Sequence, residues 1–213
     1  MKVAVYSGSF DPLHIGHLAI MERLRDMGEF DAVYLVVSPQ NPLKSPEKSA
    51  NADARLAAAR EALSRHPELC HQMLKQVQHD GERHPDSRHP DPRHPELVSG
   101  SFVRVDDIEF SLPQPNYTIA TLDALKRREP ENDFTLVIGA DSLCDIRRWK
   151  DWERILVDYG VIVYPRKGYD TTELDLEDER YRIRFIDAPM VDISSTRIRE
   201  LKACGKDISN YII

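Results

Sequence analysis

The first 17 residues, MKVAVYSGSFDPLHIGH, join an apolar run to a glycine-containing turn and then to a pair of histidines. Val3–Ser7 has the near-continuous apolar character of a strand buried on both faces. The segment 17–27 has the spacing of a helix. A strand, a tight turn and a helix in this order open a βαβ unit, so the N-terminal stretch predicts an α/β fold.

The rest of the chain repeats this alternation of strand and helix. Further strands are predicted over residues 32–38, 134–139 and 160–164, with weaker ones over 102–106 and 184–188. Helices are predicted over residues 53–65, 118–128, 151–158 and 195–203. We therefore expect one domain with a doubly wound parallel sheet. In such sheets ligands bind at the carboxyl ends of the strands, so the strand-to-helix loops should carry the chemistry.

Composition narrows the class of protein. The 213 residues are 41% hydrophobic and 31% charged, which is typical of a globular chain. The formal net charge of −7 disfavours binding to nucleic acid. We expect neither a signal peptide nor a membrane span, because no apolar run approaches about 20 residues. The three cysteines lie far apart, which favours a reducing cytoplasm over a disulfide framework.

One segment, at about residues 67–101, interrupts the pattern. RHPEL occurs at residues 65–69 and 93–97, RHPD occurs at 83–86 and 88–91, and six of the eight histidines fall in this region. Clustered histidines can bind metal, and a histidine-rich metal-storage protein is one alternative. Because proline follows most of these histidines, no rigid ligand geometry is specified. We favour a disordered, low-complexity insertion between a helix and the next strand, on the side away from the site.

The turn after the first strand has the features of a phosphate site. Gly8 allows a sharp bend and a close approach to a ligand. His14 and His17 are three residues apart at a helix start, so both rings project from one face. Gly16 removes a side chain where a base or ribose could lie. The exposed amides and positive dipole end of the helix add further donors.

A second anion site is predicted before the last helix. Ser194, Ser195 and Thr196 combine hydroxyl groups with a helix N-terminus, and Arg199 can place a guanidinium on phosphate oxygens. Taken alone, the pattern is equally typical of a serine N-cap and a solvent-facing arginine. A triphosphate needs donors from more than one loop, which favours the phosphate interpretation.

These motifs resemble those of a known family. GSFDPLHIGH (residues 8–17 with Ser7 before it) resembles the GGTFDPxHxGH signature of the HxGH nucleotidyltransferases. The resemblance continues through four further segments: PQNPLK (39–44), NYTIATL (116–122), GADSL with Trp149 (139–149) and ISSTRIR (193–199). Of these, NYTIATL and the GADSL segment with Trp149 point to the nicotinate-nucleotide branch of the family. Leu43 stands where the family often has histidine, Ser9 where it has threonine, and Asn116 where it has serine.

The resemblance implies a Rossmann-like nucleotidyltransferase fold and a set of site residues. The implied catalytic residues are His14, His17 and Arg199. The implied ATP-binding residues are Gly8, Ser9, Phe10, His14, Gly16, His17, Ser194, Ser195, Thr196 and Arg199. The implied acceptor-binding residues are Gln40, Lys44, Tyr117, Thr118, Asp141 and Trp149. Trp149 would stack on a pyridine ring, and backbone amides near Thr118 and Trp149 would receive a carboxylate. For Asp141, a hydrogen bond to ribose or to a neighbouring loop is favoured over general-base chemistry.

The implied reaction is transfer of AMP from ATP to nicotinate mononucleotide in NAD biosynthesis. No protein residue is expected to bind metal, and Mg²⁺ would be held mainly by the ATP phosphates. Nicotinamide mononucleotide and phosphopantetheine are alternative acceptors, and a nucleotide-binding regulatory module without catalysis is an alternative from another class. The sequence leaves open whether a homo-oligomer forms.

Overall fold

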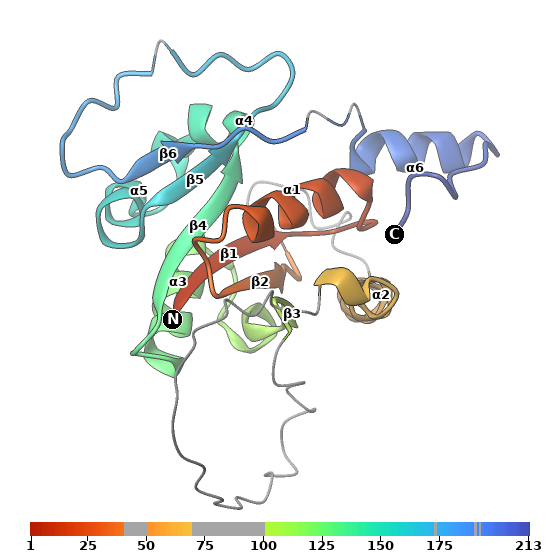
Figure 1. Cartoon of the computed structure of the whole chain (residues 1–213), viewed down its shortest axis with the longest axis horizontal. Helices are drawn as coiled ribbons and strands as arrows, with labels where there is room; N and C mark the ends of the chain where they lie inside the picture. Colours follow the sequence, from red (N-terminus) through yellow and green to blue (C-terminus); the bar gives the residue numbers. More distant parts are fainter. Residues whose placement is uncertain (41–50, 70–100, 173, 190, 192) are drawn as a thin grey trace, which may run out of the picture.

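The computed structural model describes residues 1–40, 51–69, 101–172, 174–189, 191 and 193–213. Its centre is a six-stranded sheet in the order β3-β2-β1-β4-β5-β6, and every neighbouring pair of strands is parallel (Figure 1). The strands are β1 (Lys2–Gly8), β2 (Ala32–Val37), β3 (Val103–Asp106), β4 (Asp133–Gly139), β5 (Val161–Tyr164) and β6 (Ile183–Phe185). The predicted doubly wound parallel sheet is therefore confirmed.

The helices are α1 (Ile15–Asp26), α2 (Ala52–Ser64), α3 (Thr118–Arg128), α4 (Ala140–Cys144), α5 (Trp152–Arg154) and α6 (Ser195–Ala203). Four of the five predicted helices lie close to their predicted bounds, and one short helix, α4, was not predicted. The single helix predicted over residues 151–158 is wrong, because α5 gives way to a π-helical turn, η5 (Ile155–Tyr159). The Gly160 N–H donates to the Ile155 carbonyl at 2.8 Å, five residues back, and Gly160 then takes a φ of 74°. A wider last turn and a glycine end this helix.

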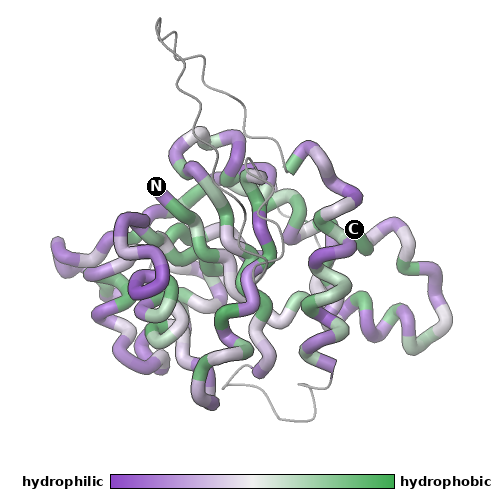
Figure 2. The backbone as a smooth tube through the Cα atoms, turned by 90° about the horizontal axis from the view of Figure 1, so that it is seen from below, coloured by the Kyte–Doolittle hydropathy of each residue, from purple (hydrophilic) through white to green (hydrophobic). Residues whose placement is uncertain are grey.

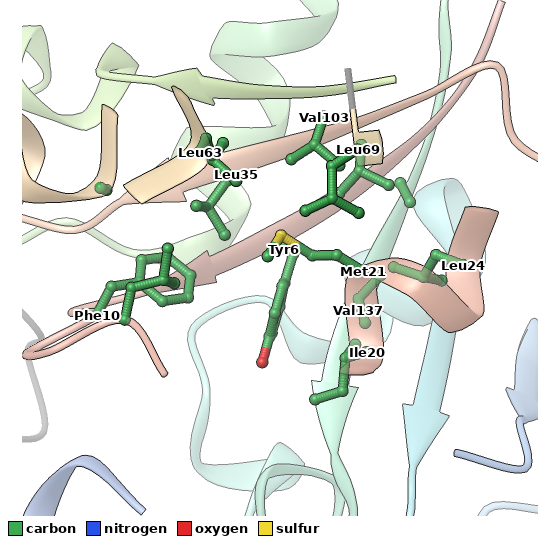
Figure 3. Close-up of a cluster of buried hydrophobic side chains, with 14 of the residues drawn as sticks. Tyr6, Phe10, Ile20, Met21, Leu24, Leu35, Leu63, Leu69, Val103 and Val137 are labelled. Atoms are coloured by element: carbon green, nitrogen blue, oxygen red, sulfur yellow. The ribbon is translucent and has the colours of Figure 1, made fainter. Parts of the chain in front are cut away.

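The sheet is buried on both faces, as continuous apolar strands require. Alternate residues of β1 point to opposite sides. Ala4 and Tyr6 join a cluster with α1 and α2, whereas Val3 and Val5 join a cluster with α3. Figure 3 shows part of the first cluster, to which α1 contributes Met21 and Leu24 and β2 contributes Leu35. Apolar residues follow the central strands, and hydrophilic residues occupy the outer helices and loops (Figure 2).

The strand order determines where a ligand can bind. β1 and β4 are neighbours at the centre, and the chain leaves them toward opposite edges of the sheet. The loops after these strands therefore diverge and leave a crevice at their carboxyl ends.

The first residues of the proposed insertion are described by the structure. Pro67–Leu69, placed at its start, form a 3₁₀ turn (η2), and Leu69 is fully buried in the core. Residues 70–100, which carry most of the His-Pro repeats, lie outside the described residues. In the part of the chain that the structure describes, no helix has the length and apolar character to cross a bilayer.

Candidate active site

Two adjoining cavities lie at the carboxyl ends of the central strands. One, of about 180 Å³, is bounded by the loops after β1, β2 and β4; we call it the aromatic cavity, because Tyr117 and Trp149 line it. The other, of about 270 Å³, is lined by His14, His17 and Arg166; we call it the histidine cavity. Tyr6 of β1 and Tyr164 of β5 line both cavities. A ligand that occupies both would therefore pass these two tyrosines.

The two histidines cap the N-terminus of α1. His14 is the N-cap residue, and its Nδ1 accepts a hydrogen bond from the Gly16 N–H at 3.1 Å. The His17 Nδ1 in turn accepts from the His14 N–H at 3.2 Å. The rings lie 3.7 Å apart between centroids and are tilted by 32°. This is a capping box in which imidazole nitrogens replace the usual hydroxyl and carboxylate oxygens.

This arrangement decides which ring nitrogen carries the proton. Since each Nδ1 accepts a backbone N–H, it must be unprotonated, and in the neutral ring the proton then sits on Nε2. Burial and the nearby charge of Arg166 lower the pKa of His14 from 6.5 to about 4. Burial, His14 and Arg166 also lower the pKa of His17 well below its usual value. Both rings are therefore neutral donors at neutral pH.

Gly16 is required by the His14 ring. A Cβ at Gly16 would lie 3.0 Å from the Cε1 of His14, so a side chain here would push the ring off the Gly16 N–H. Although Gly16 also borders the histidine cavity, the space that it leaves is taken by the imidazole. The HxGH spacing is therefore explained by the N-terminal cap of α1, in which both histidines and Gly16 take part.

The expectation of free amides at the start of α1 is wrong. The Ile15 N–H donates to the Tyr211 carbonyl at 3.0 Å, and His14 forms an isolated antiparallel bridge with Ile212. The Gly16 N–H is taken by His14, and the His17 N–H donates to the His14 carbonyl at 2.8 Å. Any anion in the histidine cavity must therefore be held by side chains rather than by these amides.

Arg166 is the main site residue that the motifs did not reveal. It follows β5 and lies in the histidine cavity beside both imidazoles. Its Nη2 donates to the Tyr164 hydroxyl at 3.3 Å, and its Nε lies 3.4 Å from Asp141 Oδ1. The pKa of Arg166, reduced by burial, is raised overall by these neighbours, so the guanidinium stays charged. Asp141 and Tyr164 thus orient a cation toward the two neutral donors.

The aromatic cavity brings together residues from three predicted segments. Gly8, Ser9, Tyr117, Thr118 and Trp149 all line it. The Lys150 ammonium lies 4.9 Å from the centre of the Tyr117 ring. These residues combine a flat aromatic wall with a positive charge, which suits a planar, anionic ligand.

A buried carboxyl group forms part of the same cavity. Glu109 is 4% exposed and accepts hydrogen bonds from Ser7 Oγ at 3.2 Å and from Thr121 Oγ1 at 2.9 Å. Asn116 donates to the Glu109 backbone carbonyl at 2.8 Å, which fixes the loop before α3. Burial raises the pKa of Glu109 against the effect of its hydrogen-bond donors. This residue was also missed, because a single glutamate in a loop carries no distinct signal.

Two other predicted residues, Phe10 and Gln40, do not line either cavity. Phe10 is buried, and its ring packs edge-on against His17 at 5.1 Å while its backbone holds a φ of 43°. Phenylalanine seldom adopts this left-handed conformation, and the buried ring packs against both His17 and Tyr6. The Gln40 carbonyl accepts from Ser38 Oγ at 3.4 Å. Lys44 lies outside the described residues.

The start of α6 contacts the loop before α1 but does not line either cavity. Ser194 caps α6 by accepting from the Arg197 N–H at 3.2 Å. Ser195 donates to the Pro12 carbonyl at 3.2 Å. Arg199 donates to the Asp11 carbonyl at 2.6 Å and to Thr196 Oγ1 at 3.0 Å. In this conformation Ser195 and Arg199 donate hydrogen bonds to the protein itself, while Ser194 and Thr196 accept them.

The comparisons with known proteins agree with this arrangement. The cytidylyltransferase-like family model matches residues 5–201. A probable nicotinate-nucleotide adenylyltransferase of Bacteroides fragilis is 34% identical over 99% of this chain and 87% of its own length. One of Flavobacterium johnsoniae is 32% identical over 98% of this chain and 90% of its own length.

The chain belongs to the cytidylyltransferase-like family, and within it to the nicotinate-nucleotide adenylyltransferases.

Solved structures show the same fold. The Plasmodium falciparum nicotinic acid mononucleotide adenylyltransferase complexed with NaAD superposes with a TM-score of 0.67 at 17% identity, covering 99% of this chain and 90% of its own. In the adenylyltransferase described here, the family match includes the second half of β1, both cavities and the start of α6. The resemblance inferred from the five motifs is therefore confirmed at the level of the family.

Proposed function

We propose that this adenylyltransferase moves AMP from ATP to nicotinate mononucleotide, giving nicotinate adenine dinucleotide and pyrophosphate in NAD biosynthesis. The observation that carries the proposal is the pairing of the two cavities. Two neutral imidazole donors and Arg166 line one, the aromatic wall lines the other, and Tyr6 and Tyr164 join them.

The chemistry requires positioning more than proton transfer. An oxygen of the acceptor phosphate attacks the α-phosphorus of ATP, a new P–O bond forms, and the bond to the β-phosphate oxygen breaks as pyrophosphate leaves. The second pKa of a phosphate monoester is about 6, so the nucleophile is largely dianionic at neutral pH and needs no base. The barrier comes from repulsion between anions, which hydrogen-bond donors and cations reduce.

The neutral histidines fit this need. Their Nε2–H groups would donate to oxygens of the triphosphate, with His17 nearest the α-phosphate. Because both Nδ1 atoms are held by the backbone, the donors are oriented before substrate binds. Arg166, which we add to the predicted set, would neutralise charge on the same phosphates.

The remaining predicted roles belong to this proposal. Tyr117, Thr118 and Trp149 would hold the pyridine and its carboxylate, and Gln40 and Lys44 would contact the acceptor. Gly8 and Ser9 would border the nucleotide. Ser194, Ser195, Thr196 and Arg199 would receive the β- and γ-phosphates once Asp11 releases Arg199. Asp141 acts through Arg166, and a ribose contact is proposed in addition.

Mg²⁺ is proposed as the accompanying ion. Among the described residues no group of three or more His, Cys, Asp or Glu side chains is placed to bind a metal. The histidine cavity instead offers cationic and neutral donors, so the phosphates themselves would be the ligands of the ion. When bound, Mg²⁺ would neutralise charge on the phosphate oxygens.

Two further proposals concern the chain as a whole. We propose that the His-Pro repeats are an insertion that the reaction does not need. We also propose that the protein works in the cytoplasm, where ATP is available.

The decisive experiment is a pyrophosphate-release assay with ATP and each of three acceptors: nicotinate mononucleotide, nicotinamide mononucleotide and phosphopantetheine. We expect the highest kcat/KM with the first. A higher kcat/KM with another acceptor would contradict the proposed substrate. ATP binding without pyrophosphate release from any acceptor would favour a regulatory module.

A further inference from the structure

Arg55 of α2 is a buried cation behind the wall of the aromatic cavity. It is 6% exposed. Its Nη1 donates to the Ser9 carbonyl at 2.5 Å and to the Ser38 carbonyl at 2.8 Å, and its Nη2 donates to the Pro39 carbonyl at 2.9 Å. One guanidinium therefore binds the loop after β1 and the loop after β2 together.

The partners of this arginine are unusual, because all three are backbone carbonyls. In the part of the chain that the structure describes, its guanidinium contacts carbonyl oxygens rather than a carboxylate, and its Nε has no hydrogen-bond partner. Burial lowers the pKa of Arg55, which Asp11 partly offsets, but the group remains charged. A buried charge without a carboxylate in contact is costly, so a stabilising role alone explains it poorly.

The position of the carbonyls links Arg55 to the cavity. Ser9 and Ser38 line the aromatic cavity, while their carbonyl oxygens accept hydrogen bonds from the arginine. One residue thus separates the guanidinium from the ligand space. The arginine holds three partial negative charges and adds a full positive charge beside a cavity assigned to an anionic mononucleotide.

We propose that Arg55 is a positioning residue for the acceptor: it fixes the two strand-to-helix loops and makes the aromatic cavity favourable for an anionic mononucleotide. This inference rests on the proposed function. Arg55 does not touch the reacting atoms, so its effect should appear in acceptor affinity more than in turnover.

The test compares three variants with the parent protein. Arg55→Gln removes the buried charge, Arg55→Lys keeps the charge but cannot reach all three carbonyls, and Arg60→Gln is the matched control. Arg60 lies on the same helix, is exposed and binds Asp107 on the surface at 2.8 Å. Both glutamine variants change the net charge equally, so a difference between them reports the position of the charge.

We expect Arg55→Gln to raise KM for nicotinate mononucleotide by about tenfold and KM for ATP much less, because three buried acceptors lose their donor beside one cavity. Arg55→Lys should show a smaller rise of the same sign, and Arg60→Gln should match the parent. Isothermal titration of the mononucleotide alone should show the same order.

The possible failures are distinguishable. A parent protein that releases no pyrophosphate contradicts the proposed function. An active parent whose Arg55 variants lose only thermal stability, or weaken both substrates equally, overturns the inference about Arg55. If Arg55→Gln does not fold, Arg55→Lys becomes the test. An unchanged KM for the acceptor in Arg55→Lys would then be incompatible with the proposal.

Discussion

His14 and His17 contact each other at the N-terminus of α1. The backbone N–H of His14 donates to Nδ1 of His17 at 3.2 Å, and the ring centroids lie 3.7 Å apart. The contact leaves Nε2 of each ring as its remaining polar atom. The same residues therefore cap the N-terminus of α1 and supply the donors proposed for the triphosphate.

Capping and catalysis can be separated at His17. Asparagine places its amide oxygen near the position of Nδ1 and is a good capping group, but it has nothing at the position of Nε2. We expect His17→Asn to lower kcat by about 10²–10³-fold and to change the melting temperature little. Saturating pyrophosphate-release rates and thermal denaturation measure the two effects. Unchanged turnover in a folded variant would remove His17 from the mechanism.

The lowered pKa of His14 predicts acid sensitivity of the fold. In the native state its pKa is about 4, whereas the unfolded ring has an ordinary pKa near 6.5. Between these values the unfolded chain binds a proton that the native chain does not, so stability falls as pH decreases from 6.5 to 4. Over this pH range, protonation of His14 in the unfolded chain should lower the free energy of unfolding by on the order of 3 kcal/mol.

Urea unfolding at several pH values measures this loss. His17, whose pKa is also lowered, adds to it in the same direction. The variant His14→Asn lacks the titrating ring but keeps a capping oxygen, and it should lose less stability over the same range. Parallel pH profiles for parent and variant would rule out His14 as the source.

Arg166 should control the histidines as well as the phosphates. Burial is the main cause of the lowered pKa of both rings, and the charge of Arg166 adds to it, so Arg166→Gln should raise both pKa values part of the way toward 6.5. The same change should lower kcat/KM for ATP by about tenfold or more, since a charge-assisted donor is lost. NMR titration of the histidine ring protons gives the pKa values. Arg180→Gln, in an exposed pair with Asp178, is the control and should leave both quantities unchanged.

The proposed insertion can be tested by deletion. Residues 69 and 101 flank the segment near the amino end of β3, whereas both cavities lie at the carboxyl ends of the strands. Replacing residues 72–98 with a short Gly-Ser linker should leave kcat and both KM values within about twofold, because loop length has a small entropic effect. A large loss of activity in a folded deletion variant would assign the repeats a part in catalysis.

The sequence predicted the parts of the fold that depend on local patterns. Strands β1, β2, β4 and β5 are continuous apolar runs, and their bounds differ from the prediction by one residue at most at either end. The π turn before Gly160 was not predictable, because residues 151–158 carry an ordinary helical pattern. Its register depends on packing of Ile155 and Leu156 against the sheet.

The missing parts of the site depend on contacts between distant segments. Nothing near residue 15 indicates that the Tyr211 carbonyl takes its amide, and nothing in ISSTRIR indicates that Asp11 binds Arg199. Arg166 and Lys167 follow a predicted strand after a single proline, which was a usable signal. Basic pairs are common on surfaces, however, and only the tertiary structure places Arg166 beside the histidines.

Trp149 offers the clearest test of the aromatic cavity, because Trp152 provides a matched control. Trp149 lines the cavity, whereas Trp152 packs edge-on against Tyr181 at 5.7 Å and does not line it. We expect Trp149→Ala to raise KM for nicotinate mononucleotide by about 10- to 100-fold through loss of a stacking surface, with KM for ATP nearly unchanged. Trp152→Ala should lower stability but leave both KM values intact. Equal effects of the two variants on the acceptor would mean that general loosening of this region, and not stacking on Trp149, determines its affinity.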